Sequence, residues 1–280
     1  MSMYSSRRML VLDFDGTMTD AELEGRPFRT GYLEDLCALV GRSAGDDEVE
    51  GIAREVEREL AERPAEHPFL WMGRAVAPAT VDPYLRMVPI AHRVLDRFGA
   101  LPGETDRGRL LGQVLYKYNY AKTLGHPAFR AHAAEVLASL EGTPTYIVTN
   151  SDTHAVAGKV VALGVPWLTS RVRGGARKFD VDDEWLGAPA ELAVPGLNRP
   201  VLLRRKRYHD ILRALLDENG ATWSELTVIG DIFELDLAMP LAMGASVGLV
   251  VSERTPAYER AFVAGHARGR LIEDLRQITS

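Results

Sequence analysis

The stretch MLVLDFDGTMTD, residues 9–20, begins with four apolar residues and then places Asp13 and Asp15 two positions apart. An apolar run that ends at polar residues is typical of a buried parallel strand. Carboxylates are depleted in strands and unfavourable to bury, so two of them at a strand's end need a chemical reason. Gly16 follows, and a glycine allows a sharp turn that helps to expose backbone N–H groups to an anion. The stretch therefore indicates a polar site at the end of a buried strand.

Three further apolar runs have the same form, namely TYIVTN (145–150), LTVIGD (226–231) and SVGLVV (246–251). WLTSRV (167–172) is a weaker strand candidate. Alternating strands and helices predict an α/β fold, a doubly wound, Rossmann-like parallel sheet with helices on both faces. The amphipathic segments expected to form these helices are 127–142, 153–164, 208–220 and 235–244.

The region from residue 20 to 125 breaks this alternation and shows helices without a convincing strand. Its stretch 46–63, DDEVEGIAREVERELAER, carries apolar residues at helical spacing. A long helical block between the first two strands is typical of an inserted cap domain. We therefore expect a core domain of residues 1–19 and 126–280 and a helical cap domain of residues 20–125.

Two smaller features of the chain allow more than one interpretation. The stretch 174–200 interrupts the alternation again and predicts a small insert or a β-hairpin excursion. Tyr116 and Tyr120 lie four residues apart, on one face of a predicted helix. That face either reaches over a substrate pocket or, more often for such a stripe, packs against a neighbouring helix.

The composition, with 46% hydrophobic and 26% charged residues, is that of an ordinary soluble globular protein. A net charge of −6 argues against a general nucleic-acid binder or a binder of anionic membranes. The single cysteine, Cys37, cannot form an internal disulfide. No apolar run is long enough to span a bilayer, and the N-terminal run is too short for a signal peptide. The expected location is the cytoplasm.

Polar residues follow the ends of three predicted strands: Asp13 and Asp15, Thr149 and Asn150, and Asp231. Ligands of open parallel sheets bind beyond the carboxyl ends of the strands, so we expect these residues to converge. One carboxylate can attack phosphorus, and a second can act as general acid and then as general base. Carboxylates that share a pocket need a cation between them, and Mg²⁺ suits oxygen ligands and phosphoryl transfer.

Three stretches, LVLDFDGTMTD, YIVTN and VIGDIFELD, follow one another in a characteristic order. Together they resemble the first, second and fourth motifs of the haloacid dehalogenase superfamily of aspartate-nucleophile phosphotransferases. The resemblance covers residues 8–20 and roughly 127–280. The block after the first motif is similar in position to the helical cap that this family inserts there.

The resemblance implies a role for each matched residue. Asp13 would be the nucleophile and a magnesium ligand. Asp15 would be the general acid and base, with its backbone carbonyl on the metal, and Asp231 would be a further metal ligand. Thr149 would donate its hydroxyl to the transferring phosphoryl group, assisted by the backbone N–H of Asn150.

The family's third motif is only a lysine or arginine upstream of the fourth. We favour Lys206, which lies just before the helix that leads into the fourth-motif strand, as this catalytic and phosphate-binding lysine, with Lys178 as its rival. A cation beside the nucleophile would hold the carboxylates together and balance phosphoryl charge. Gly16 is expected to contribute to phosphate binding. Asp236 and Glu234 are weaker candidates for orienting the metal ligands.

The sequence thus predicts a magnesium-dependent phosphatase that hydrolyses a small phosphorylated metabolite through an aspartyl-phosphate. A phosphomutase that uses the same intermediate and a catalytically idle binding protein with this fold remain alternatives. Asp15 disfavours a dehalogenase, because many dehalogenases of the superfamily lack an acid there. The motifs of P-loop NTPases and dinucleotide-binding dehydrogenases are missing from the sequence.

Overall fold

A computed structural model describes residues 9–103, 107–123 and 127–279 of the chain, which fold into two compact units. The first unit holds the described chain up to Thr19, the segment Pro68–Ala77 and the chain from Phe129 onward. The second holds Asp20–His67 and Pro78–Ala128. The expected boundary between cap and core at residue 125 lies outside the described residues, so that part of the domain division stays a prediction.

The first unit is built on a six-stranded sheet in the order β10-β9-β8-β1-β4-β5, whose neighbouring strands are all parallel. All four residues of β1 are buried, as expected of a central strand that is covered on both faces. In chain order the strands are β1 (Met9–Leu12), β4 (Thr145–Val148), β5 (Val172–Arg173), β8 (Leu226–Gly230), β9 (Ser246–Val250) and β10 (Gly269–Ile272).

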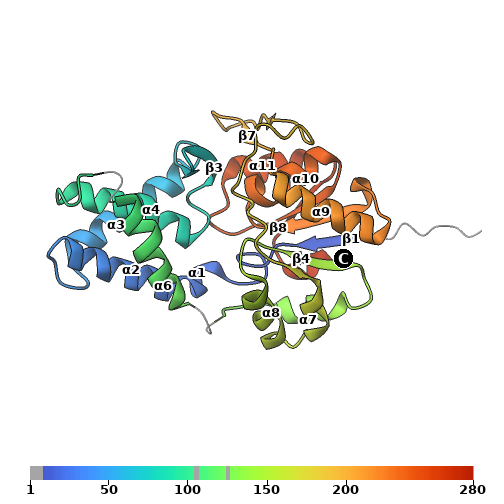
Figure 1. The fold of residues 1–280 in the computed structure, drawn as a ribbon, viewed down its shortest axis with the longest axis horizontal. Helices are drawn as coiled ribbons and strands as arrows, with labels where there is room; N and C mark the ends of the chain where they lie inside the picture. Colours follow the sequence, from blue (N-terminus) through green and yellow to red (C-terminus); the bar gives the residue numbers. More distant parts are fainter. Residues whose placement is uncertain (1–8, 104–106, 124–126, 280) are drawn as a thin grey trace, which may run out of the picture. The chain divides into compact units, whose positions relative to one another are not determined.

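Helices cover both faces of this sheet, which confirms the doubly wound α/β prediction. In Figure 1, α7 and α8 lie below the sheet, whereas α9, α10 and α11 lie above it. Apolar residues of α7 and α8 join those of β1 and β4 in one buried core. The helices are α7 (Ala133–Ser139), α8 (Thr153–Ala162), α9 (Lys206–Asn219), α10 (Ala238–Met243) and α11 (Ala257–Gly265), with shorter helical turns η2 (Pro166–Arg171), η3 (Trp223–Glu225), η4 (Phe233–Leu237) and η5 (Leu275–Ile278).

Two strand predictions at the sheet edges need correction. The segment 167–172 is mostly the 3₁₀ turn η2, and β5 covers only the two residues after it. The edge strand β10 was missed, because its sequence GRLI contains a glycine and an arginine and lacks a clear apolar run. Both elements are short, and both are held by pairing with a longer neighbour.

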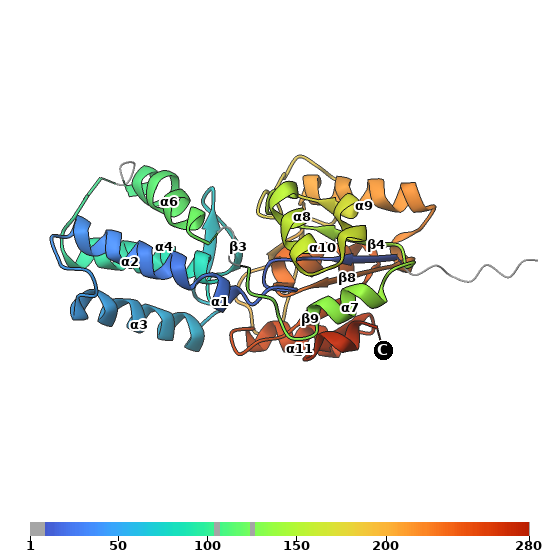
Figure 2. The ribbon, with the colours of Figure 1, turned by 90° about the horizontal axis from the view of Figure 1, so that it is seen from below.

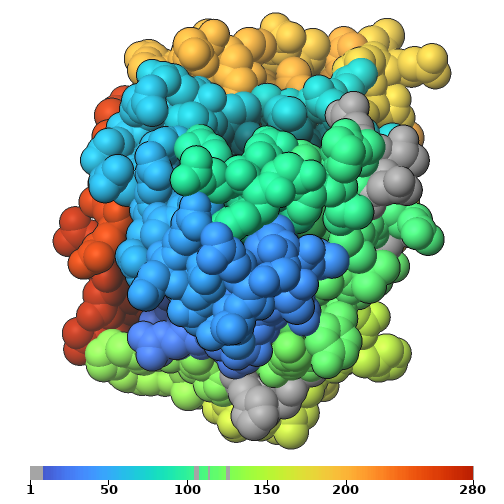
Figure 3. Space-filling view, turned by 90° about the vertical axis from the view of Figure 1, so that its left-hand side faces the viewer, coloured from blue at the N-terminus to red at the C-terminus, as the bar shows by residue number. Residues whose placement is uncertain are grey.

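The second unit is helical, with its long helices alongside one another (Figure 2). Tyr116 and Tyr120 pack against aromatic rings of neighbouring helices, at 5.1 Å from Phe28 and 5.5 Å from Tyr84 between ring centroids. In the space-filling view of Figure 3, the blue and green residues of this unit adjoin one another across the visible face. Its elements are α1 (Ala21–Glu24), α2 (Arg26–Leu39), α3 (Asp47–Glu62), α4 (Pro83–Arg97), the π-helical η1 (Arg109–Leu115) and α6 (Tyr116–Ala121).

The prediction that residues 20–125 contain no strand is wrong. Strands β2 (Pro68–Trp71) and β3 (Arg74–Pro78) form a hairpin, and nearly all of it belongs to the first unit. Met72 and Gly73 both have positive φ angles, 50° and 77°, as a two-residue turn of the primed type requires. The strands lack alternation between polar and apolar residues, so the hairpin leaves little trace in the sequence.

The stretch 174–200 is an excursion from the sheet that returns through a short antiparallel pair, β6 (Glu191–Leu192) with β7 (Val201–Leu202). The hairpin alternative is therefore the better description of this insert.

Among the described residues, no helix combines the length and the apolar character that crossing a bilayer requires.

Two valines of α8 offer a matched test of this packing. Val156 faces the core and is fully buried, whereas Val161 is 56% exposed on the same helix. Val156→Ala should lower the free energy of unfolding by about 2 kcal/mol, because it removes buried methyl groups and leaves a cavity. Val161→Ala should leave it nearly unchanged, since alanine has the higher helix propensity. Urea unfolding measures both, and equal effects would contradict the placement of α8.

Candidate active site

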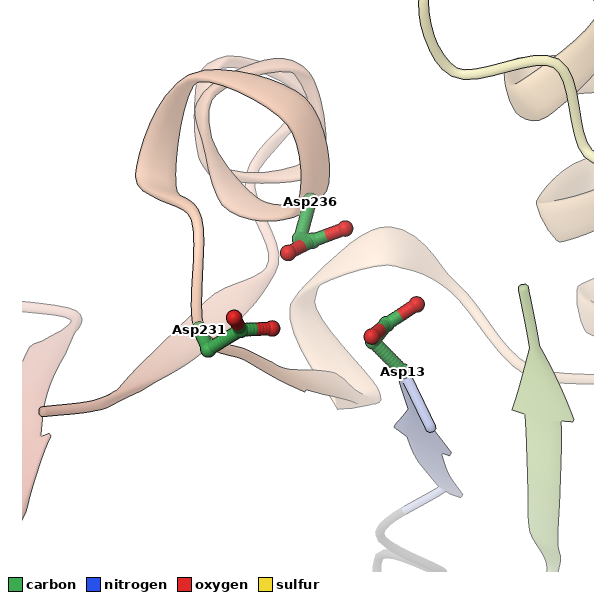
Figure 4. Close-up of side chains that lie close together, drawn as sticks. All are labelled: Asp13, Asp231 and Asp236. Carbon is green, nitrogen blue, oxygen red and sulfur yellow. The ribbon is translucent and has the colours of Figure 1, made fainter. Parts of the chain in front are cut away.

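Three aspartates meet beyond the carboxyl ends of the central strands. Asp13 follows β1, Asp231 follows β8, and Asp236 comes from the π-helical segment η4. One carboxylate oxygen of each lies within 4.8 Å of the others, and all three residues are buried. Figure 4 shows their carboxylates facing a common space. Asp13 and Asp231 thus converge as predicted, and Asp236, a weaker candidate, joins them.

The parallel pairing of β1 with β8 fixes this convergence. Leu12 lies opposite Ile229, so the residues that follow each strand leave the sheet at the same edge. The Asp13 N–H continues the pairing and donates to the Ile229 carbonyl at 2.8 Å. Asp236 is fixed by its own turn, where Oδ2 accepts from the Ile232 N–H at 3.0 Å.

Two glycines leave room for these carboxylates. Gly16 has φ +87°, and a Cβ built on it would lie 2.3 Å from Asp231 Oδ2. A Cβ on Gly230 would lie 2.5 Å from the Asp236 Cβ. The expected sharp turn at Gly16 is therefore present. Its own N–H donates to the Thr19 hydroxyl at 3.0 Å, so this donor caps the turn.

Lys178 is the cation that contacts the aspartate cluster directly. Its Nζ donates to Asp13 Oδ1 at 2.6 Å and to Asp236 Oδ1 at 2.8 Å, and its side chain is only 1% exposed. Burial alone would lower the pKa of Lys178, but the charges of Asp13 and Asp236 outweigh burial and raise it above its ordinary value. The ammonium therefore stays charged between two carboxylates.

The prediction that Lys206 rather than Lys178 lies beside Asp13 is wrong, because Lys178 is the lysine that contacts Asp13. Lys206 is 48% exposed on α9 and pairs with Asp210. Lys178 reaches the site because the backbone of the insert is fixed there. Its N–H donates to Asn150 Oδ1 at 2.7 Å, which brings the lysine to the sheet edge. Lys178 follows β5 closely, and the strand's brevity hid that signal in the sequence.

Asp15 lies beside the aspartate cluster and is held by a different set of hydrogen-bond donors. Its Oδ1 accepts from Lys159 Nζ at 2.7 Å and its Oδ2 from the Thr149 hydroxyl at 3.3 Å. Its side chain is 28% exposed, against 10% for that of Asp13. The structure thus brings Thr149 to Asp15 as predicted, while the Asp15 carboxylate stays outside the aspartate cluster. Lys159 was missed, because a lysine in a helix usually indicates a solvated face.

Thr17 was also missed as a site residue. Its hydroxyl donates to Asp231 Oδ1 at 2.9 Å and lies 3.3 Å from Asp13 Oδ2, so it joins two of the three carboxylates. The available signal was its place in the D-x-D-G-T stretch after β1. Asp236 and Glu234 were the weaker candidates for orienting the metal ligands. Glu234 is not part of the aspartate cluster, and its carboxylate pairs with Arg199 instead.

The cluster carries more negative charge than Lys178 can balance. Burial raises the pKa of Asp13 to about 7, although Lys178 opposes this shift. Burial and the neighbouring charges of Asp236 and Asp13 raise the pKa of Asp231 well above its ordinary value. Such a buried set of carboxylate oxygens fits a small divalent cation of the magnesium type, which would relieve the repulsion.

No protein-family model and no curated protein sequence matches this chain. Solved structures do match its fold. A haloacid dehalogenase-like hydrolase from Streptococcus pneumoniae shares 13% identity at a TM-score of 0.55, with 98% of each chain covered. A protein from Haemophilus somnus, described as a predicted phosphoglycolate phosphatase, shares 14% identity at a TM-score of 0.54, with 99% of this chain and 100% of the other covered.

A third match is a haloacid dehalogenase-type hydrolase from Bacillus subtilis whose structure is described as bound to magnesium. It shares 16% identity at a TM-score of 0.52, with 97% of this chain and 96% of the other covered. At these identities the comparison bears on the fold. This chain has the fold of the haloacid dehalogenase-like hydrolases.

Proposed function

We propose that this protein is a magnesium-dependent phosphatase that hydrolyses a small phosphorylated metabolite through an aspartyl-phosphate on Asp13. The observation that carries the proposal is the pairing of two differently held aspartates. Asp13 is buried against Lys178 and two further carboxylates. Asp15, two residues later, is partly exposed, and its carboxylate is hydrogen-bonded to Lys159 and Thr149. This is the division of roles that a nucleophile and a general acid require.

Asp13 attacks phosphorus through one carboxylate oxygen. Lys178 holds Oδ1 at 2.6 Å, whereas the contact of Oδ2 with a described residue is the longer one with the Thr17 hydroxyl, at 3.3 Å. Oδ2 is therefore the oxygen better placed to form the bond to phosphorus. The fixed ammonium orients the carboxylate and contributes positive charge where the phosphoryl group transfers.

Asp15 donates a proton to the leaving oxygen and later takes one from the water that hydrolyses the aspartyl-phosphate. Lys159 and Thr149 hold one oxygen of its carboxyl each, so its orientation is fixed while it remains accessible. The Thr149 hydroxyl, which donates to Asp15 in the structure, would turn its single proton to the phosphoryl group when substrate binds. Asn150, expected to bind phosphate, contributes its side chain to the Lys178 loop.

Asp13, Asp231 and Asp236 would hold the magnesium ion, with the Asp15 carbonyl as the further ligand that the family resemblance implies. When bound, magnesium neutralises the carboxylates and the phosphoryl oxygens. A fold neighbour described as magnesium-bound supports this assignment. We further propose that the helical unit, inserted between β1 and β4, acts as a cap that excludes bulk water during turnover.

Asp13→Asn should abolish hydrolysis of p-nitrophenyl phosphate, with a loss of at least about a thousandfold, because the amide cannot attack phosphorus. Asp210→Asn is the matched control, since Asp210 is exposed on α9 and, among the described residues, pairs with Lys206 and His209, away from the aspartate cluster. Steady-state rates and circular dichroism measure activity and fold. Substantial activity in a folded Asp13→Asn variant would refute the assignment.

Lys178→Met and Lys206→Met form a second matched pair. Removal of the buried ammonium should lower kcat by about a hundredfold or more, because the nucleophile loses its orienting cation. Removal of the exposed lysine, which makes a surface ion pair, should change kcat by less than about twofold. Kinetics on both variants decide between the two lysines, and the reverse order of effects would restore Lys206.

Magnesium affinity should rise with pH through about 7, because the pKa of Asp13 is raised to about 7 and a proton there competes with the cation. Below that pH the carboxyl is neutral, and above it the carboxylate is free to bind. Calorimetric titration at about pH 6 and about pH 8 should show roughly tenfold tighter binding at the higher pH. Asp13→Asn should weaken this dependence without abolishing it, because the pKa of Asp231 is raised as well. Equal affinities in the wild type would contradict the assignment.

A further inference from the structure

Glu234 lies in the turn that joins two of the clustered aspartates, yet its carboxylate is bound by other residues, Arg199 and Tyr258. It stands three residues after Asp231 and two before Asp236, within η4. Its side chain is 1% exposed, and its carboxylate pairs with Arg199. A buried carboxylate this close to a metal-binding turn must be held by specific partners, since an unpaired one would be strongly destabilising.

Arg199 forms a bidentate ion pair with Glu234. Nη1 donates to Oε2 at 2.8 Å and Nη2 donates to Oε1 at 3.0 Å. The Tyr258 hydroxyl of α11 adds a third hydrogen bond to Oε1 at 2.8 Å. A two-point arginine–carboxylate contact fixes direction as well as distance, so the Glu234 side chain has one orientation.

The backbone of the same turn is held from the other side. Glu259 of α11 accepts from the Phe233 N–H at 3.3 Å and from the Glu234 N–H at 3.4 Å. The Ile232 N–H donates to Asp236 Oδ2, which ties the turn to a clustered carboxylate. A shift of the turn at Glu234 would therefore move the Asp236 oxygens directly.

Magnesium is demanding about the placement of its oxygen ligands, because it requires a near-octahedral arrangement at short distances. Partners that orient a ligand from outside are for this reason often as important to affinity as the ligand itself. Arg199 lies in the insert 174–200, just before β7, and reaches the turn across a long sequence distance. The same insert carries Lys178.

We propose that Arg199 is a positioning residue that fixes the Asp231–Asp236 turn for magnesium by clamping Glu234. This inference rests on the proposed magnesium site. The insert thus acts on the site twice, through Lys178 on the nucleophile and through Arg199 on the metal-binding turn. Arg199 itself touches neither of the aspartates in the described contacts, so its effect passes through Glu234.

The test is calorimetric titration of the full chain with magnesium chloride, without substrate. Arg199→Met should weaken magnesium binding by about tenfold, the lower end of the range for removing a ligand's direct partner, because Arg199 acts through Glu234. Arg204→Met is the matched control, because Arg204 also flanks β7 but donates to the Asp183 carbonyl, away from the turn. Arg204→Met should bind magnesium as the wild type does.

Arg199→Lys covers the case in which Arg199→Met does not fold. It keeps the positive charge but loses the two-point contact, so it should fold and bind magnesium with an intermediate affinity. In a turnover assay, raised magnesium should restore kcat of Arg199→Lys, which a general structural defect would not allow. A folded variant of Arg199 that binds magnesium as tightly as the wild type overturns the inference. No binding by the wild type would instead overturn the proposed magnesium site.

Discussion

Three buried carboxylates lie together in this protein, with one ammonium group bound to two of them, and the surrounding structure makes that arrangement possible. The parallel pairing of β1 with β8 delivers Asp13 and Asp231 to one edge, and glycines at 16 and 230 leave space for them. Lys178 opposes part of the cost of this arrangement, but burial, followed by the charge of Asp236, still raises the pKa of Asp13. A bound divalent cation would complete the balance, which connects the fold to phosphate chemistry.

The insert 174–200 and the few residues between it and α9 supply the cations that the sheet does not. Lys178 reaches Asp13, Arg199 reaches Glu234, and the buried Arg205, just before α9, donates to the Lys178 carbonyl. Arg205 also donates to the Val76 carbonyl at 2.9 Å, so the hairpin β2–β3 is tied to the same insert. A segment with little regular structure thus positions both the nucleophile's partner and the metal-binding turn.

The inner strands of the sheet and their acidic edge were predictable from the sequence, because apolar runs that end in polar residues indicate buried strands with side chains gathered beyond them. The two edge strands, β5 and β10, were not. Asp13 and Asp231 needed nothing more. Lys178 could be named only as the rival of Lys206, and Lys159 was missed, since their positions depend on how an irregular insert and a helix face pack. The hairpin β2–β3 escaped because a left-handed turn at Met72 and Gly73 has no clear residue pattern here.

The central claim is that Asp13 forms a covalent bond to phosphorus, and chemical trapping tests it most directly. The protein is mixed with magnesium and acetyl phosphate or p-nitrophenyl phosphate, quenched within one turnover, and reduced with borohydride. Reduction converts an aspartyl-phosphate to homoserine, which peptide mass spectrometry locates. We expect homoserine at position 13 and nowhere else. Phosphate release without any modified aspartate, or with the modification at another residue, would contradict the account.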